Sequence, residues 1–139
     1  MATFNKFNSF VEAIAEKAHN LGSDTLKVML TLTAPAATNT VKADLTEISA
    51  GNGYTAGGTA ASITSSSQTS GTYKLVLGDV VFTASGGSIA NFRYAVLYND
   101  TATNDELIGY WDYGSTVTVA TGETFTVDFD ATNGVLTIA

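Results

Sequence analysis

The spacing of apolar residues changes once along the chain, from a helical period to a strand period. Between Phe7 and Leu21 apolar side chains recur every three or four residues, which places them on one face of a helix. Ser9 and Glu12 have the spacing of a capping box, and Gly22 is expected to end the helix in a left-handed conformation. A helix of about 12 residues is marginal alone in water, so its apolar face needs a surface to pack on.

From residue 25 the apolar positions alternate with a period of two. Residues 25–33 are predicted to form a half-buried strand that ends before Pro35, the only proline. Residues 41–48 have a weak strand pattern, whereas residues 51–58 contain four glycines and are expected to form a loop. Residues 60–71, with one isoleucine among serines and threonines, are predicted to be at best an edge strand.

The second half of the chain is a succession of strand signals separated by polar turns. The apolar positions before and after Gly78 and Asp79 have opposite parity, which predicts a bulge or a tight turn there. Residues 115–120 and 123–130 are predicted to form a hairpin, because their apolar side chains can face one another across a short turn. Further strands are predicted at residues 73–77, 80–82, 92–98, 107–113 and 135–138.

This order of elements predicts the fold class. Roughly seven or eight strands with no helix between them favour an antiparallel arrangement over a parallel sheet. We therefore expect a mainly β protein, an antiparallel β-sandwich of jelly-roll-like type with a short N-terminal amphipathic α-helix. The helix or arm would occupy residues 1–22 and the sandwich domain residues 23–139, a length that supports one core without disulfides.

Charge and composition exclude several classes of function. The chain has 6 Lys plus Arg against 13 Asp plus Glu and a net charge of −7, which disfavours a nucleic-acid partner. It contains no cysteine and one histidine, so thiol chemistry, zinc sites and histidine-based triads are not expected. We expect no enzyme activity, no cofactor and no metal. No apolar run is long enough for a membrane span and the N-terminus does not read as a signal peptide, so a membrane partner is not expected.

One acidic loop is a candidate for cation binding. In residues 99–106, calcium could bind through Asp100, Asp105 and Glu106, but the alternating acids and central glycine of an EF-hand are missing. A solvated hairpin tip is the favoured interpretation of this loop. His19 lies near the end of the predicted helix and is expected to be a capping cation there.

The strands at residues 92–98 and 107–113 are apolar on both faces. The favoured interpretation is a pair of central strands in a two-layer core. The alternative is that one face is a protein interface or an aromatic platform for a ligand, because Tyr and Trp are enriched at both. The residues of the candidate interface come from the helix, the glycine-rich loop and these two strands: Phe7, Phe10, Val11, Ile14, Tyr54, Tyr94, Tyr98, Tyr110, Trp111 and Tyr113.

Four segments carry a resemblance to a known class of protein. They are DTLKVMLTLTAP (24–35), ADLTEISAGNGYTAGG (43–58), FRYAVLYNDT (92–101) and LIGYWDYGSTVTVATGETFTVDFDATNGVLTIA (107–139). Together they resemble small structural proteins of tailed-bacteriophage virions, which include head decoration, or cement, proteins. The resemblance extends over most of the chain and contains no mechanistic motif.

The resemblance implies a β-rich, non-enzymatic protein that binds and stabilises the outer head shell. Its partner would be the major capsid protein, and it would act as a homo-oligomer, with a trimer favoured. It would be assembled in the host cytoplasm and lie on the outer capsid surface of the virion, where the N-terminal helix would contact the capsid or a neighbouring subunit. One alternative is a carbohydrate-binding or host-adhesion module that uses the aromatic residues of the two central strands. The other is a neck or tail component.

Overall fold

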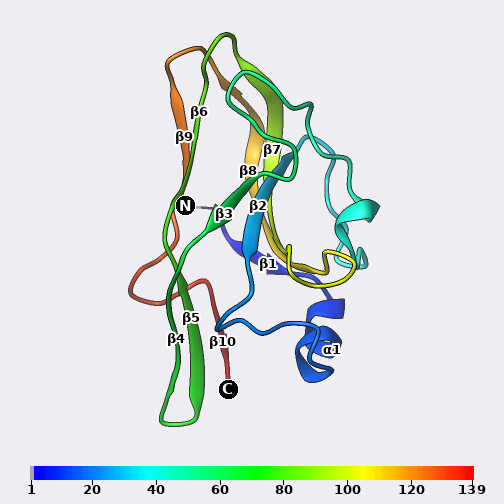
Figure 1. Cartoon of the computed structure of the whole chain (residues 1–139), viewed down its shortest axis with the longest axis vertical. Coiled ribbons are helices and arrows are strands. Elements are labelled where there is room, and N and C mark those ends of the chain that lie inside the picture. Colours follow the sequence, from blue (N-terminus) through cyan, green and yellow to red (C-terminus); the bar gives the residue numbers. More distant parts are fainter. Residues whose placement is uncertain (1) are drawn as a thin grey trace.

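The computed structural model describes residues 2–139, which form a mainly β structure with antiparallel pairing between its strands (Figure 1). The larger sheet has five strands. Their order across the sheet is β1 (Phe4–Lys6), β8 (Leu107–Val119), β7 (Ile89–Asn99), β2 (Leu26–Thr31) and β3 (Thr59–Ala61).

Two smaller sheets form the opposing layer of this sandwich-like arrangement. The chain runs from one small sheet into the other at Gly78 and Asp79, so the change of phase predicted there is confirmed. The jelly-roll connectivity stays a prediction. One small sheet has the order β10 (Leu136–Ile138), β5 (Thr72–Leu77) and β4 (Ile63–Thr69), and the other pairs β6 (Val80–Thr83) with β9 (Thr124–Val127).

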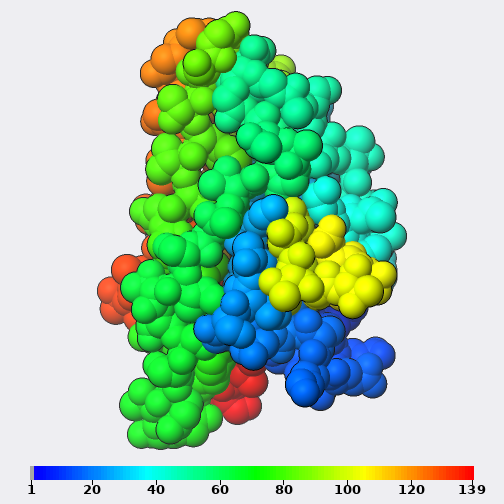
Figure 2. All heavy atoms as spheres, viewed as in Figure 1, coloured from blue at the N-terminus to red at the C-terminus, as the bar shows by residue number. Residues whose placement is uncertain are grey.

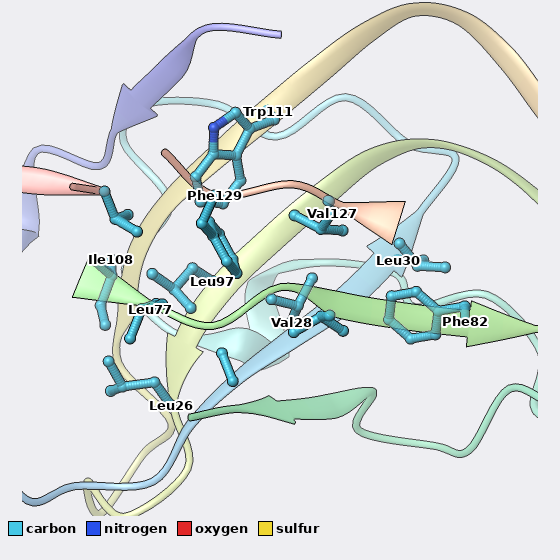
Figure 3. Close-up of a cluster of buried hydrophobic side chains, with 14 of the residues drawn as sticks. Leu26, Val28, Leu30, Leu77, Phe82, Leu97, Ile108, Trp111, Val127 and Phe129 are labelled. Atoms are coloured by element: carbon cyan, nitrogen blue, oxygen red, sulfur yellow. The ribbon is translucent and has the colours of Figure 1, made fainter. Parts of the chain in front are cut away.

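The main core lies between the two layers, where alternate side chains of each layer meet (Figure 3). The larger sheet contributes Val28 and Leu97, which are fully buried. The opposing layer contributes Phe82 and Phe129, and Phe129 packs edge to face on Trp111 at 5.4 Å between ring centroids. Strand alternation therefore supplies this core as the sequence pattern predicts.

Strand β2 is buried on both faces, which corrects the half-buried strand predicted for residues 25–33. Met29 and Thr31, on the face expected to be polar and exposed, have no exposed surface. Residues 34–58 cross the outer face of the larger sheet and cover it, next to the loop between β7 and β8 (Figure 2). A second hydrophobic cluster forms beneath this segment from Phe7, Met29, Val96, Tyr98 and Leu107.

The covering segment is not a strand. The weak strand predicted at residues 41–48 is wrong, because a short 3₁₀ helix, η1 (Lys42–Asp44), lies there instead. The Asp44 carboxylate accepts hydrogen bonds from the backbone N–H groups of Thr40 and Val41 at 2.8 and 3.2 Å. These bonds stabilise the local turn in place of a strand ladder. They also lower the pKa of Asp44 below its usual value.

The N-terminal helix α1 (Ser9–Ala15) is shorter than predicted and packs on its own sandwich. Phe10 is buried in the main core, and β1 adds a strand to the larger sheet before the helix begins. The capping box is wrong, since no side chain caps the first turn. The left-handed residue after the helix is Lys17, with φ +68°, and not Gly22. An earlier helix end lets the following residues turn back toward the core.

The hairpin predicted for residues 115–130 is also wrong. The end of β8 pairs with β7, as in the register of Val117 with Phe92, whereas β9 pairs with β6 in the opposing layer. The turn at residues 120–123 therefore carries the chain from one layer to the other. Phe125 still approaches the residues that face it, but across the core: its ring lies 4.8 Å from Phe92, edge to face.

Candidate functional site

A pocket of about 710 Å³ lies at the end of the molecule where α1 and the β4–β5 hairpin are found (Figure 1). Its walls are the segment after α1, the tip of the β7–β8 hairpin and one face of β4 and β5. Both apolar and polar side chains line it, among them His19, Asp24, Ser66, Tyr73, Glu106 and Ile138. Two other pockets, of about 310 and 390 Å³, are smaller, so we take this one as the candidate site.

The ring of His19 is held in one protonation state by Asn99. The Asn99 side-chain oxygen accepts hydrogen bonds from the backbone N–H groups of Thr101 and Ala102, at 2.9 and 3.2 Å. Its Nδ2 group therefore points the other way, toward His19 Nδ1 at 3.0 Å and Asp24 Oδ2 at 2.7 Å. Because the amide nitrogen can only donate, His19 Nδ1 must accept, and the ring is neutral with its proton on Nε2.

Burial favours the same neutral state. His19 is only 4% exposed, and this burial lowers its pKa below 6.5, although the carboxylates of Glu106 and Asp24 act in the opposite direction. Nε2 is enclosed and has no hydrogen-bond partner among the described residues. The expectation that His19 is a capping cation is therefore wrong. Its ring also packs on Phe10 at 5.4 Å between centroids, so it is part of the wall that joins α1 to the sheet.

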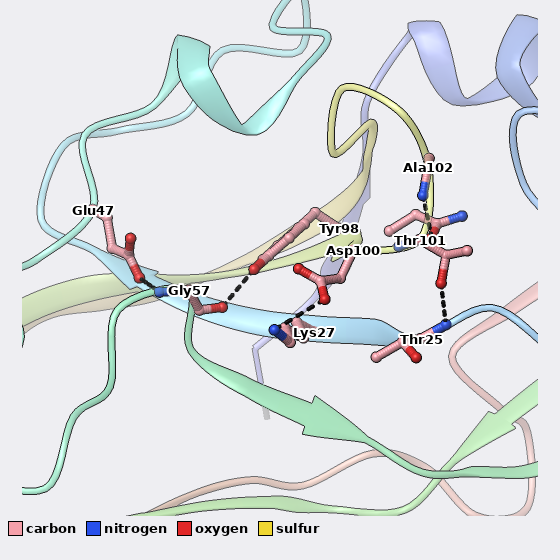
Figure 4. A network of polar contacts seen from close by, with 9 residues as sticks. Thr25, Lys27, Glu47, Gly57, Tyr98, Asp100, Thr101 and Ala102 are labelled. Carbon is pink, nitrogen blue, oxygen red and sulfur yellow. Dashed lines mark hydrogen bonds and ion pairs between the residues drawn. The ribbon is translucent and has the colours of Figure 1, made fainter.

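The polar groups around the pocket join its two loops to each other (Figure 4). The backbone N–H of Thr25 donates to Thr101 Oγ1 at 2.8 Å, and the backbone N–H of Asp100 donates to the carbonyl of Thr25 at 2.9 Å. Lys27 Nζ lies 3.0 Å from Asp100 Oδ2. These contacts hold the chain before β2 against the β7–β8 tip, so the site is stabilised on two sides.

Glu47 organises a second polar cluster, over the outer face of the larger sheet (Figure 4). Its Oε1 accepts hydrogen bonds from the hydroxyl of Tyr54 at 2.6 Å and from the backbone N–H of Gly57 at 2.5 Å. Its Oε2 lies 3.3 Å from Lys42 Nζ. The Tyr98 hydroxyl donates to the Gly57 carbonyl at 2.6 Å. Burial raises the pKa of both tyrosines, so they act here as neutral donors.

Replacing Glu47 with alanine is expected to lower the free energy of unfolding by about 2–3 kcal/mol, because two buried or half-buried donors lose their acceptor. Glu47→Gln is the matched control, since its amide oxygen can still accept from Tyr54 and Gly57 while the ion pair with Lys42 is lost. That control should cost less than about 1 kcal/mol. Urea unfolding and hydrogen exchange of residues 41–58 measure both effects. Equal losses in the two variants would contradict the role given to Oε1.

The residues of the candidate interface do not form a common surface. Val11 is 53% exposed, and Ile14, Tyr110 and Tyr113 are partly buried. The remaining six are buried: Phe7, Phe10, Tyr54, Tyr94, Tyr98 and Trp111. The interpretation of β7 and β8 as central strands of a core is confirmed. The rings of Tyr94, Tyr98 and Trp111 are too buried to stack on a sugar, which counts against the carbohydrate-binding alternative.

The acidic loop at residues 99–106 is the tip of the β7–β8 hairpin, as favoured above. Asp100 is paired with Lys27, and Glu106 accepts a hydrogen bond from the backbone N–H of Asn104 at 3.2 Å. In the part of the chain that the structure describes, no group of three or more His, Cys, Asp or Glu residues is placed to hold a metal ion. The calcium alternative therefore gains no support from the arrangement of Asp100, Asp105 and Glu106.

Sequence reasoning missed Asn99, Asp24 and Glu47, the residues that organise the two polar clusters. These residues bond to partners that are distant in sequence, as Asn99 does to Asp24, or that lie in an irregular loop. No periodic pattern in the sequence reveals such contacts. The one signal in the sequence is that Asn99 follows a run of apolar strand residues. An asparagine in this position is typical of a residue whose side chain bonds to the backbone of the following turn.

Across residues 2–139 no helix has the length and apolar character needed to cross a membrane. Comparisons of this chain with protein-family models, with curated proteins and with solved structures found no match.

Proposed function

We propose that this chain is a non-enzymatic structural protein of a tailed-phage virion. It binds the outer head shell as a decoration, or cement, protein, with the major capsid protein as its partner, and it acts as a homo-oligomer. The resemblance of four of its segments to virion structural proteins motivates this proposal. The mainly β, antiparallel fold agrees with the β-rich character that the resemblance implies.

The observation that carries the proposal is that carboxylates in the loops accept hydrogen bonds from the loop backbone. They accept hydrogen bonds from the backbone of their own or a neighbouring loop: Asp24 from Asn20 N–H, Glu47 from Gly57 N–H, and Asp130 from Thr132 and Asn133 N–H. These bonds hold the loops in one conformation. A surface that is ordered before binding loses less conformational entropy when it meets a partner. This suits a structural protein whose role is to bind a partner surface tightly.

A shell also offers many equivalent binding positions, which suits a protein with ordered binding loops. When many copies bind equivalent positions of one particle, a modest affinity at each site is enough to stabilise the whole particle. The net charge of −7 is compatible with a place outside the DNA-filled interior, where no phosphate contacts are needed.

The direct test is to mix the purified protein with mature shells that lack it and to image the particles by electron microscopy. We expect added density at equivalent positions of the head surface. Bare head surfaces at micromolar protein would overturn the proposal. Density confined to the neck or tail would instead support the neck or tail component.

A further inference from the structure

A long uncharged stretch occupies one side of this acidic protein. No Asp, Glu, Lys, Arg or His occurs between Ile48 and Tyr73, although the chain as a whole has a net charge of −7. This stretch contains β3 and β4, which follow each other directly in the chain. In Figure 2 the green segment that contains them lies on the face toward the viewer, at the surface of the molecule.

Both strands of this stretch are edge strands. β3 ends the five-stranded sheet, and β4 ends the three-stranded sheet, where it pairs only with β5. At seven residues, β4 is the longest edge strand among residues 2–139. Most of its side chains are exposed or half-buried, and they are nearly all Ser, Thr or Gln. Its outer edge therefore presents unpaired backbone N–H and C=O groups to solvent.

Two other edge strands, β1 and β9, carry or adjoin charged residues that β4 lacks. β1 ends in Lys6, and β9 lies between Glu123 and Asp128. Charged residues at an edge discourage pairing with a second strand, because the charge would have to be desolvated or would meet a like charge. An edge of seven residues with no charge and no proline is the reverse of this arrangement, and it permits pairing with another strand.

We propose that β4 pairs antiparallel with β4 of a second copy of this chain, about a two-fold axis, to form one continuous sheet across the dimer. Charge favours a second copy as this partner. Two copies with a net charge of −7 each repel one another, and at the stretch from Ile48 to Tyr73 they can approach without placing acidic side chains opposite one another.

The side chains of β4 are compatible with this self-pairing. An antiparallel strand can pair with itself because a two-fold axis places the same residues on both sides of the contact. Ser65, Ser67 and Thr69 are short hydroxyl side chains on alternate positions, and such residues form favourable cross-strand pairs. The resulting sheet would have the order β10-β5-β4-β4-β5-β10.

The inference rests on the homo-oligomer of the proposed function and gives it a surface and a symmetry. A two-fold contact makes a dimer, in contrast to the trimer that the resemblance favours. Because the contact involves only this chain, it can be measured on the purified protein without shells.

Sedimentation equilibrium of the 139-residue chain over a range of micromolar concentrations tests the pairing. We expect a species of twice 14.4 kDa, and tighter association at higher salt because salt screens the repulsion between acidic copies. The double variant Ser67→Glu, Thr69→Glu places like charges at the contact and should raise the dimer Kd by roughly tenfold or more. The matched control is Thr124→Glu, Thr126→Glu on β9, which adds the same charge at exposed positions of another strand and should leave the dimer Kd near that of the unmodified chain.

Urea unfolding confirms that both variants are folded before their masses are compared. A monomeric unmodified chain, a trimer, or a dimer weakened no more by the β4 variant than by the β9 control would each overturn the inference. A monomer that still coats shells would overturn this inference and leave shell binding in place. A β4-dependent dimer that leaves shells bare would support the pairing and overturn the proposed function.

Discussion

Replacing Gly58 with alanine is expected to lower the free energy of unfolding by roughly 3–4 kcal/mol, among the largest effects of any single substitution. A methyl group there would overlap the carbonyl oxygen of Val28 and lie 2.6 Å from its carbonyl carbon and 2.8 Å from the Cα of Met29. These are backbone atoms of Val28 and Met29, two fully buried residues of β2, so no side chain can rotate away to make room. The φ of +77° at Gly58 adds strain for any residue with a Cβ.

Gly71→Ala separates these two causes. Gly71 has a similar φ of +83°, but a Cβ there would have no atom within 4 Å. We expect a loss of only about 1 kcal/mol, from backbone strain alone. Urea unfolding followed by the fluorescence of Trp111 measures both variants. If Gly71→Ala is as damaging as Gly58→Ala, the close approach of the loop to β2 is not the reason for glycine at position 58.

The second prediction with a large effect is how the free energy of unfolding changes with pH because of His19. Because its folded pKa is lowered, the neutral ring contributes stability above the unfolded value of 6.5. That contribution is lost as the pH falls through 6.5 toward the folded pKa. The unmodified protein should therefore become less stable as the pH falls from above 6.5 to below 6.5. His19 is the only histidine, so its imidazole resonances can be followed by NMR without assignment by mutation.

Asn99→Asp is expected to reverse this dependence. One oxygen of the new carboxylate can keep the bonds from Thr101 and Ala102, but the other would face Asp24 Oδ2 and His19 Nδ1, where the amide now donates to both. Near neutral pH we expect a loss of roughly 3 kcal/mol or more, because two carboxylates share a buried site. A proton on His19 relieves this repulsion, so the folded pKa of His19 should rise above 6.5. Stability is then recovered as the pH falls and is lost as the pH rises through that folded pKa.

Asn91→Asp is the matched control for Asn99→Asp. Asn91 is exposed on β7, and its side-chain oxygen accepts a hydrogen bond from Thr118 Oγ1 at 3.1 Å, which a carboxylate can also accept. This control should leave the titration of His19 and its pH-dependent stability unchanged. A His19 pKa that stays below 6.5 in Asn99→Asp would contradict the orientation of the Asn99 amide on which the neutral ring depends.

The strands of the core could be read from local patterns because alternation is a property of each strand by itself. Residues 92–98 and 107–113 are apolar at nearly every position, which already indicates cover on both faces, and β7 and β8 are central in the larger sheet. The change of phase at Gly78 and the glycine-rich loop at residues 51–58 were predictable for the same reason. Each depends on the backbone freedom or parity of a few adjacent residues.

The errors occur where a distant segment decides the outcome. The alternation of residues 115–120 and 123–130 suits a hairpin as well as it suits two strands in opposite layers, since Phe125 faces β8 in both cases. Met29 and Thr31 are buried only because residues 34–58 fold over them. The candidate site depends in the same way on Asn99 meeting His19, a contact across 80 positions of sequence.

By itself, the sequence determined that this protein is mainly β, that its strands alternate around an apolar core, and that one long stretch is free of charge. Composition and local period carry that information. The tertiary structure decided which strands pair, which face of β2 is covered, and that His19 is neutral. It also placed β3 and β4 of the uncharged stretch at two sheet edges, where we propose that a second copy pairs with β4. These outcomes depend on segments far apart in the chain, and only folding brings those segments into contact.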